Sequence, residues 1–281
     1  MRKLNKNDKI IELTDEDLKK LQATEMELLE EFVRVCDKYN LKYVLMGGSC
    51  LGAIRHNGFI PWDDDIDVAL NRDDYDTFVK VQEHELNDKY YFDCMENDED
   101  HNLVQGKLKK KGTIASELLS NLPVEKQGIW LDIFPLDKVS DNDKVLKKEF
   151  YKVFCTKIMI SFKLGNEHHS KSKAKELVLR LLKFASHFIN LEKTKKKLYK
   201  LMTKHNIEDT KRVISYGSGY LLKAVFDKDY CNDRILHEFE GKKYYITKNY
   251  DRFLKQFYGD YMKLPPEEKR HPVHSLKKIK F

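Results

Sequence analysis

Apolar side chains recur every three or four residues after Thr14, and this spacing predicts an amphipathic helix that packs by one face. Thr14 supplies a capping oxygen, and Asp15, Glu16 and Asp17 place negative charge in the first turn, where the helix dipole favours it. Residues 73–86 predict a second amphipathic helix. Each of these helices is expected to bury one side and expose the other.

Short β-prone runs lie between and after these helices. The first run, residues 42–46, ends at a glycine pair, and Ser49 is expected to cap the short helix that follows. Residues 64–70 predict a strand with apolar side chains on its buried side. Further strands are expected at residues 90–95, 103–109 and 129–134. Helices and strands therefore mix in the first 140 residues, as in an α+β or α/β domain.

Strand signals disappear from residue 144 to about residue 206, and this region is expected to be helical. Residues 141–212 hold 19 lysines and arginines against 8 acids, in a chain with a net charge of +6. Such a basic region attracts anionic partners, with a solvated helix face as the alternative. A wide apolar stripe, flanked by lysines, is formed by Leu177, Val178, Leu181, Leu182, Ala185, Phe188, Ile189 and Leu191.

Residues 47–70 read GGSCLGAIRHNGFIPWDDDIDVAL and place four carboxylates within one short stretch. In an extended strand alternate side chains share a face, so Asp63, Asp65 and Asp67 point one way. Asp64 is expected to point the other way. Like charges repel, and a cluster that stays ionised needs a positive partner, most simply a divalent metal ion such as Mg²⁺. Asp65 and Asp67 are therefore the candidate metal ligands, whereas Asp63 has the equal alternative of a solvated position beside a loop.

A third carboxylate is wanted from another strand, to complete the metal coordination and to accept the proton of an attacking hydroxyl. Asp132 is the best candidate, because it stands alone among apolar residues in IWLDIFPLD, where a buried uncompensated charge would be costly. A capping position at the end of a helix or strand is the alternative for Asp132. A metal clamp of this kind suits phosphoryl or nucleotidyl transfer.

The glycine turn after residue 46 predicts a phosphate cradle. Glycine lacks a Cβ and lets the backbone approach a phosphate, and the start of the following helix points N–H groups at the anion. Two cations near the end of that helix and one on a candidate strand are further possible ligands, although exposed cations more often do little. The expected phosphate-binding residues are Gly47, Gly48, Ser49, Arg55, His56 and Lys107.

Several other classes of protein are disfavoured. Five cysteines lie far apart without a CxxC pair, so they are expected to be reduced core residues. The motifs GxGxxG, GxxxxGK[ST], HExxH and GxSxG do not occur. No apolar run is long enough to span a bilayer, and the start lacks the apolar stretch of a signal peptide, so a cytoplasmic protein is expected. His271 and His274 are expected to be surface or hydrogen-bonding groups rather than metal ligands.

Three motifs, GGSCLGAIRHNGFIPWDDDIDVAL, IWLDIFPLD and YGDYMKLPP, together resemble the LicD family of phosphocholine transferases in their order and spacing. The resemblance covers most of the chain. It implies a nucleotidyltransferase-like fold, related in its core to the fukutin-related ribitol-phosphate transferases. Transferred position by position, the metal-binding pair is Asp65 and Asp67, the third acid is Asp132, and Gly48 with Ser49 forms the phosphate turn.

The expected fold class is α+β, with a nucleotidyltransferase-like mixed sheet, flanking helices and a basic, mainly helical region. Residues 1–140 are expected to form the catalytic core and residues 141–212 the basic helical region. Residues 213–281 are expected to pack back on the core. These boundaries depend on shifts in charge and periodicity.

The resemblance implies Mg²⁺-dependent transfer of phosphocholine from CDP-choline to a sugar hydroxyl of a cell-surface glycan, such as lipopolysaccharide or teichoic acid, with release of CMP. Mn²⁺ is an alternative ion. Transfer of ribitol phosphate or glycerol phosphate, nucleotidyl transfer to a small molecule, and a binding module without turnover are alternative functions. Choline would favour aromatic contacts, for which core packing is an equal explanation, at Trp62, Trp130, Tyr258 or Tyr261.

The expected partners are a CDP-activated donor and a glycan or lipid-linked glycan acceptor. The lysines and the stripe from Leu177 to Leu191 also suggest peripheral association with an anionic membrane, at the inner face of the membrane. Nucleic acid is not expected as a partner, because the basic region has no recognition motif.

Overall fold

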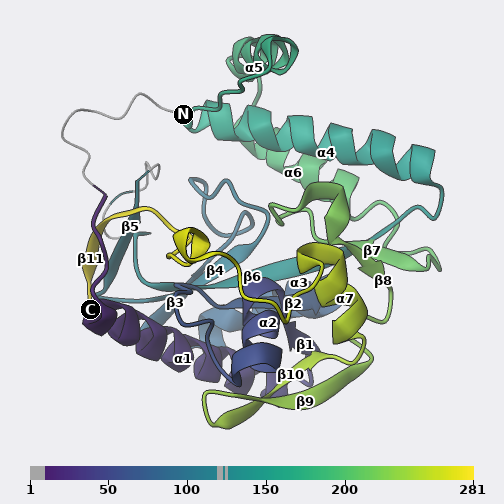
Figure 1. Ribbon diagram of the computed structural model, residues 1–281. Coiled ribbons are helices and arrows are strands. Elements are labelled where there is room, and N and C mark those ends of the chain that lie inside the picture. Colours follow the sequence, from purple (N-terminus) through teal and green to yellow (C-terminus); the bar gives the residue numbers. More distant parts are fainter. Residues whose placement is uncertain (1–9, 119–122, 124–125) are drawn as a thin grey trace.

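The computed structural model describes residues 10–118, 123 and 126–281. Most of its strands form one mixed sheet, with the order β3-β4-β6-β2-β1-β10-β9 (Figure 1). The strands are β1 (Tyr43–Leu45), β2 (Asp67–Asn71), β3 (Tyr90–Asp93), β4 (Gly106–Lys110), β5 (Ile114–Glu117), β6 (Trp130–Val139), β7 (Arg212–Ile214), β8 (Val225–Asp227), β9 (Arg234–Phe239), β10 (Lys242–Thr247) and β11 (Leu276–Lys280). β2 pairs in parallel with β6, and β1 in parallel with β10. The predicted α+β class is confirmed.

The helices confirm the two predicted amphipathic segments and the helical region. Thr14 Oγ1 accepts a hydrogen bond from the backbone N–H of Asp17 at 3.1 Å, as its capping position predicts. Residues 144–206 contain three of the helices and no strand. The helices are α1 (Asp15–Lys38), α2 (Gly47–His56), α3 (Arg72–Glu85), α4 (Asp143–Lys163), α5 (Lys173–Ser186), α6 (Leu191–Met202) and α7 (Tyr250–Tyr258).

The two faces of the main sheet differ in character. Phe32 on α1 packs against Tyr43 on β1, and Tyr43 is in register with Leu70 on β2. Most side chains in phase with these residues are apolar and face α1 and α3, although Asp137 on β6 is a charged exception that pairs with Arg72. Asp67 is out of phase with Leu70, so it points to the opposite face, where α2 and the C-terminal segment lie. The polar face of the sheet therefore carries the candidate site.

Several predicted element boundaries are wrong. β4 begins at Gly106 instead of residue 103, and β6 continues to Val139 instead of ending at residue 134. The predicted strand 64–70 begins only at Asp67, because the carboxylate of Asp64 accepts hydrogen bonds from the backbone N–H groups of Val273 and His274 instead of lying on a sheet face. The helix predicted to start after a Ser49 cap begins at Gly47, so Ser49 lies inside α2. The strand β5, which pairs with β11, was not among the predicted strands.

Segments distant in sequence complete the sheet. β10 pairs with β1, and β7 pairs with the last three residues of β6. The chain from residue 212 onward thus contributes strands that contact the first 140 residues. A second, smaller hydrophobic cluster joins α4, α6 and β7, and includes Phe150, Leu198 and Ile214. The predicted division of the chain at residues 140 and 212 stays a prediction.

Two expectations from composition can be compared with the described residues. All five cysteines are free, and four of them are buried, while Cys155 is half-buried. None of the described helices has the length and apolar character that crossing a membrane requires.

Candidate active site

Three carboxylates meet on the polar face of the sheet, near the N-terminal ends of β2 and β6. The parallel register places Asp67 opposite Asp132, and Asp65 joins them from the segment that precedes β2. One oxygen from each of the three carboxylates lies within 4.8 Å of the other two. The structure therefore brings together the three predicted metal ligands, although their role as ligands stays a prediction.

The electrostatics of this cluster fit a divalent cation. Burial, followed by the charges of Asp65 and Asp132, raises the pKa of Asp67 well above its usual value. Burial also raises the pKa of Asp65 to about 6, although the nearby His274 opposes the shift. Asp132 Oδ1 is buried and has no hydrogen-bond partner among the described residues. Hard oxygen ligands that repel one another and include an unpartnered buried atom are what Mg²⁺ or Mn²⁺ would bind.

The first turn of α2 lies directly against these acids. A Cβ on Gly47 would come within 2.8 Å of Asp67 Oδ2, and Gly47 has a φ of +58°. A Cβ on Gly48 would come within 2.7 Å of Asp63 Oδ2. Ser49 Oγ accepts a hydrogen bond of 2.8 Å from the backbone N–H of Asp67. A side chain at either position would therefore displace a carboxylate oxygen, so this turn helps to position the carboxylates, while its predicted contact with phosphate stays a prediction.

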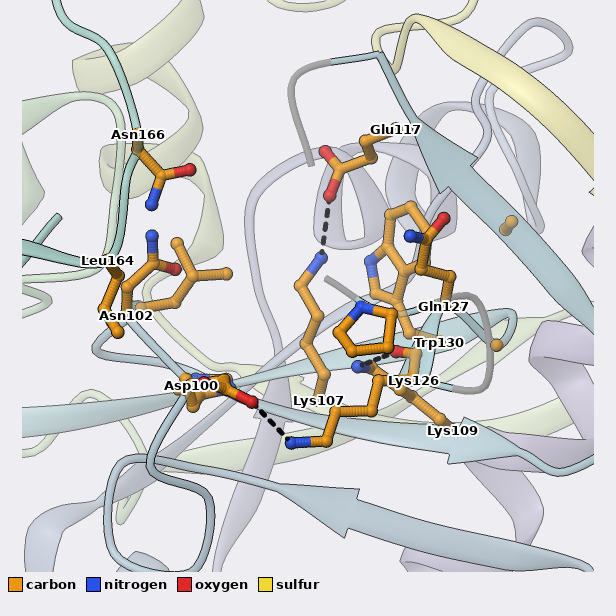
Figure 2. A pocket seen from close by; sticks show the side chains of 15 residues that line it. Asp100, Asn102, Lys107, Lys109, Glu117, Lys126, Gln127, Trp130, Leu164 and Asn166 are labelled. Carbon is orange, nitrogen blue, oxygen red and sulfur yellow. Dashed lines mark hydrogen bonds and ion pairs between the residues drawn. The ribbon is translucent and has the colours of Figure 1, made fainter. Parts of the chain in front are cut away.

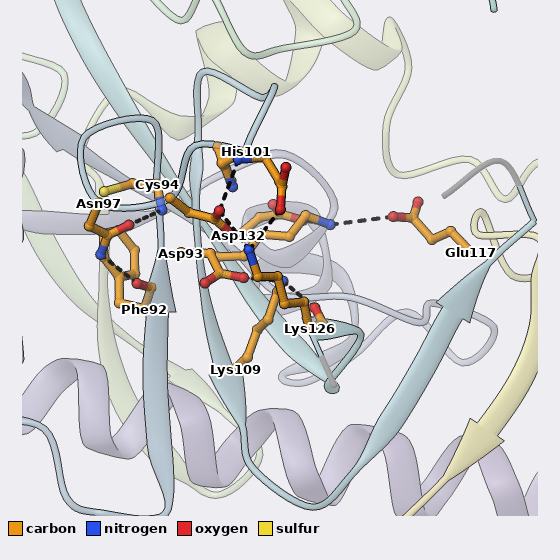
Figure 3. Close-up of polar contacts among 12 residues, drawn as sticks. Phe92, Asp93, Cys94, Asn97, His101, Lys109, Glu117, Lys126 and Asp132 are labelled. Carbon is orange, nitrogen blue, oxygen red and sulfur yellow. Dashed lines mark hydrogen bonds and ion pairs between the residues drawn. The ribbon is translucent and has the colours of Figure 1, made fainter. Parts of the chain in front are cut away.

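Three cations, Arg55, His56 and Lys107, were predicted to bind phosphate. Of these, Lys107 lies closest to the carboxylate cluster. Because β4 pairs with β6, Lys107 lies opposite Asp132, and its Nζ is 3.7 Å from Asp132 Oδ2. The same Nζ is 3.7 Å from Glu117 Oε2 and 3.8 Å from the centre of the Trp130 ring (Figure 2). Figure 3 shows the Glu117 carboxylate, at the end of β5, pointing toward Asp132. Trp130 Nε1 donates a 2.8 Å hydrogen bond to Asp132 Oδ2. An ammonium group is therefore held between an indole face and two carboxylates.

A cavity of about 390 Å³ opens beside Lys107 and Trp130 (Figure 2). Its walls combine the polar face of the sheet with Leu164 and Asn166, which follow α4. Lys109 and Lys126 add further positive charge to the lining, although each also forms ion pairs with aspartates. The size is typical of a small-molecule site. The acids thus lie next to a space with a partly basic wall.

Arg55 and His56 lie at the opposite end of α2 from the glycines. Arg55 Nη1 donates to the carbonyl oxygen of Tyr261 at 2.8 Å, and Arg55 Nε donates to His56 Nε2 at 2.9 Å. Burial lowers the pKa of both groups. These contacts attach α2 to the C-terminal segment, and the predicted part of both residues in phosphate binding stays a prediction.

His274 was not predicted as part of the site. Its Nδ1 lies 3.4 Å from Asp64 Oδ1 and 4.0 Å from Asp65 Oδ2, and its ring packs edge-on against Trp130. Burial opposes the charged form, but the hydrogen bond to Asp64 and the charge of Asp65 outweigh it and raise the pKa of His274 to about 9. Some 200 residues separate His274 from these aspartates, so no local pattern could have revealed the contact.

Glu25 is a second residue that the sequence reasoning missed. It lies on the buried face of α1, and its Oε2 has no hydrogen-bond partner among the described residues. Burial, followed by the charges of Asp65, Asp64 and Asp63, raises its pKa well above the usual value. The sequence did contain one sign of this position, because Glu25 lies between Leu21 and Leu28 on the apolar face of the helix. The raised pKa favours the protonated, neutral form of Glu25, so this position can hold a carboxyl group beside the cluster without adding to its negative charge.

Comparison with known proteins first defines the class. Residues 40–160 match the family profile described as "LicD/FKTN/FKRP, nucleotidyltransferase domain". The matched range contains β1, β2, β4 and β6 and all three clustered carboxylates. The polar face of the sheet, with its three carboxylates, thus lies within the nucleotidyltransferase domain that this profile describes.

A curated relative covers nearly the whole chain. The lipopolysaccharide cholinephosphotransferase LicD of Haemophilus influenzae is 34% identical over 261 residues, which are 92% of this chain and 96% of that protein. Uncharacterised proteins of Rickettsia prowazekii and Rickettsia typhi match about a quarter of the chain, at 34% and 31% identity. This chain belongs to the LicD family, as its motifs indicate. It is therefore a transferase of phosphate-containing groups.

Proposed function

We propose that this protein transfers phosphocholine from CDP-choline to a sugar hydroxyl of a cell-surface glycan, such as lipopolysaccharide, and releases CMP. The observation that carries the proposal is the cluster of Asp65, Asp67 and Asp132 beside a cavity with a partly basic wall. Similarity over 92% of the chain to a lipopolysaccharide cholinephosphotransferase supports the choice of phosphocholine and of a glycan acceptor.

The proposed cofactor is Mg²⁺, with Mn²⁺ as a substitute, held by Asp65, Asp67 and Asp132. When bound, the ion would neutralise negative charge on the donor pyrophosphate. Asp132 would accept the proton of the acceptor hydroxyl, which forms a new P–O bond to the phosphocholine phosphorus. The bond from that phosphorus to CMP breaks, and CMP leaves with the electron pair. Lys107 would neutralise the phosphates from the neighbouring strand.

The indole of Trp130 is the proposed contact for choline. Its face already attracts a cation, because the Lys107 ammonium lies 3.8 Å from the ring centre. In the proposed complex Lys107 turns to the donor phosphates, and the trimethylammonium group takes its place. The other three aromatic candidates do not line this cavity, and Tyr261 donates its hydroxyl hydrogen to Asp251. This cation site favours choline over an uncharged polyol.

The direct test supplies purified protein with CDP-choline, Mg²⁺ and a glycan acceptor isolated from lipopolysaccharide. CMP release and phosphocholine on the glycan are expected, and a chelator should stop both. Parallel reactions with CDP-ribitol, CDP-glycerol and CTP identify the other donors. Release of pyrophosphate from CTP, without CMP from CDP-choline, would instead identify a nucleotidyltransferase.

Substitution of Trp130 tests the choline contact separately. Trp130→Leu is expected to raise KM for CDP-choline by about tenfold relative to Trp130→Phe, because only the phenylalanine keeps an aromatic face toward the cation. Both variants lose the hydrogen bond to Asp132 Oδ2, so this comparison isolates the ring. Equal KM values for the two variants would contradict the contact.

A further inference from the structure

The apolar stripe of α5 is exposed. Leu177 and Leu181 are each 60% exposed, and Phe184 is 67% exposed. At 3.6 residues per turn these side chains fall on one side of the helix. Phe188, just after the helix end, is 76% exposed, and its ring packs edge-on against Phe184. In Figure 1, α5 lies on the outer side of α4, away from the main sheet.

Cations surround this stripe. Residues 171–186 contain five lysines and arginines and a single acid, Glu176. The Glu176 carboxylate is already engaged, because it accepts a 2.8 Å hydrogen bond from the backbone N–H of Ser170 and lies 3.7 Å from Arg180. Lys173 and Lys175 are exposed in the first turn of α5. The surface is thus an apolar strip with a positive border.

The charge decides between two possible occupants. A second copy of this chain, bound about a two-fold axis, would bring the same cations against themselves. The two neighbouring acids could compensate little, because Glu167 is ion-paired with Lys183 and Glu176 lies 3.7 Å from Arg180. An anionic lipid surface instead complements both parts, since its headgroups attract the cations and its acyl boundary accepts leucine and phenylalanine. An anionic membrane therefore supplies both the negative charge and the apolar environment that complement this strip.

We propose that α5 attaches this protein to an anionic membrane surface, with Leu181 and Phe184 inserted and the lysines at the lipid headgroups. The helix would lie in the plane of the membrane, as amphipathic basic helices do. This inference goes beyond the proposed chemistry and does not depend on it, because α5 contributes none of the residues that line the cavity beside the carboxylates.

The test is sedimentation of the full chain with vesicles of phosphatidylcholine alone or mixed with phosphatidylglycerol. Wild-type protein is expected to bind the mixed vesicles. The double variant Leu181→Glu, Phe184→Glu should lower the partition coefficient by at least about tenfold, because each buried apolar side chain contributes that much. Ile207→Glu is the matched control, since Ile207 is 96% exposed outside α5, and it should bind like wild type. Circular dichroism verifies that the variants are folded.

A charge variant completes the test. Lys173→Gln with Lys175→Gln should weaken binding to the mixed vesicles by roughly fivefold or more, because each lysine near an anionic surface contributes about that factor. CMP release with a water-soluble acceptor should be unchanged in all these variants, which separates this inference from the proposed chemistry. No binding by wild type, or undiminished binding by the Leu181, Phe184 double variant, overturns the proposal. Light scattering gives the molecular mass in solution. If wild type is a dimer and the Leu181, Phe184 double variant is a monomer, the proposal is also overturned, in favour of a second copy as the occupant.

Discussion

Asp67→Asn is expected to abolish CMP release and, in the presence of a chelator, to raise the melting temperature. Loss of a ligand to the proposed ion removes several kcal/mol of transition-state stabilisation, so the rate should fall by at least about a thousandfold. Without an ion, however, the substitution removes one of three crowded carboxylates, whose mutual repulsion and burial raise the pKa of Asp67. The melting temperature should therefore rise by about 2–4 °C, which is typical of 1 kcal/mol in a chain of this size.

Calorimetric melts with and without Mg²⁺ measure the two effects. Wild-type protein should be stabilised by the ion, because a ligand that binds only the native state adds to its stability. Asp67→Asn should lose this response. Asp88→Asn is the control, because Asp88 is exposed on the turn before β3, outside the carboxylate cluster, and neither its activity nor its melt should change. A fully active Asp67→Asn enzyme, or a melt that Mg²⁺ still raises, would contradict the assignment of the metal site.

The sequence was sufficient to predict the carboxylate cluster, for a reason that the register explains. Asp67 lies at the start of a short apolar strand, and Asp132 interrupts a second one, so each acid marks the point where its strand meets the site. Parallel pairing of β2 with β6 then places them opposite each other. Asp65 joined them although the predicted strand that was to carry it begins only at Asp67.

Contacts made by remote segments could not be predicted in the same way. His274 reaches the acids because Asp64 binds the backbone of the C-terminal segment, and the local sequence around residue 274 encodes no such partner. The position of the Lys107 ammonium over Trp130 depends on antiparallel pairing of β4 with β6. Helical periodicity correctly predicted that residues 144–206 fold as helices. Periodicity alone, however, does not say whether an apolar stripe is buried, and that of α5 is exposed.

Asp137→Asn is expected to destabilise the fold strongly, because it breaks a buried ion pair. Asp137 on β6 forms two hydrogen bonds of 2.8 Å with Arg72 at the start of α3, and the side chains are 0% and 4% exposed. Asp137 Oδ1 also accepts a 3.0 Å hydrogen bond from Asn206. The pair thus links the end of β2, through α3, to β6 and to the helical region. Removing the charge of Asp137 takes away the two-bonded counter-charge of the buried Arg72 guanidinium and leaves it the half-buried Asp76 carboxylate at 3.5 Å.

Breaking such a pair costs about 3–5 kcal/mol, because the remaining charge keeps its desolvation penalty. Urea unfolding of Asp137→Asn should therefore show that loss, and the melting temperature should fall by on the order of 10 °C. The double variant Arg72→Met, Asp137→Leu removes both charges and should recover part of the loss, since an apolar pair of similar volume has no unpaired charge. Glu192→Gln, in the exposed pair with Lys196, is the control and should cause no measurable change. If Asp137→Asn unfolds within about 0.5 kcal/mol of wild type, as surface substitutions do, the pair does not stabilise the fold. In that case the backbone hydrogen bonds between β2 and β6, without the ion pair, would hold Asp67 opposite Asp132.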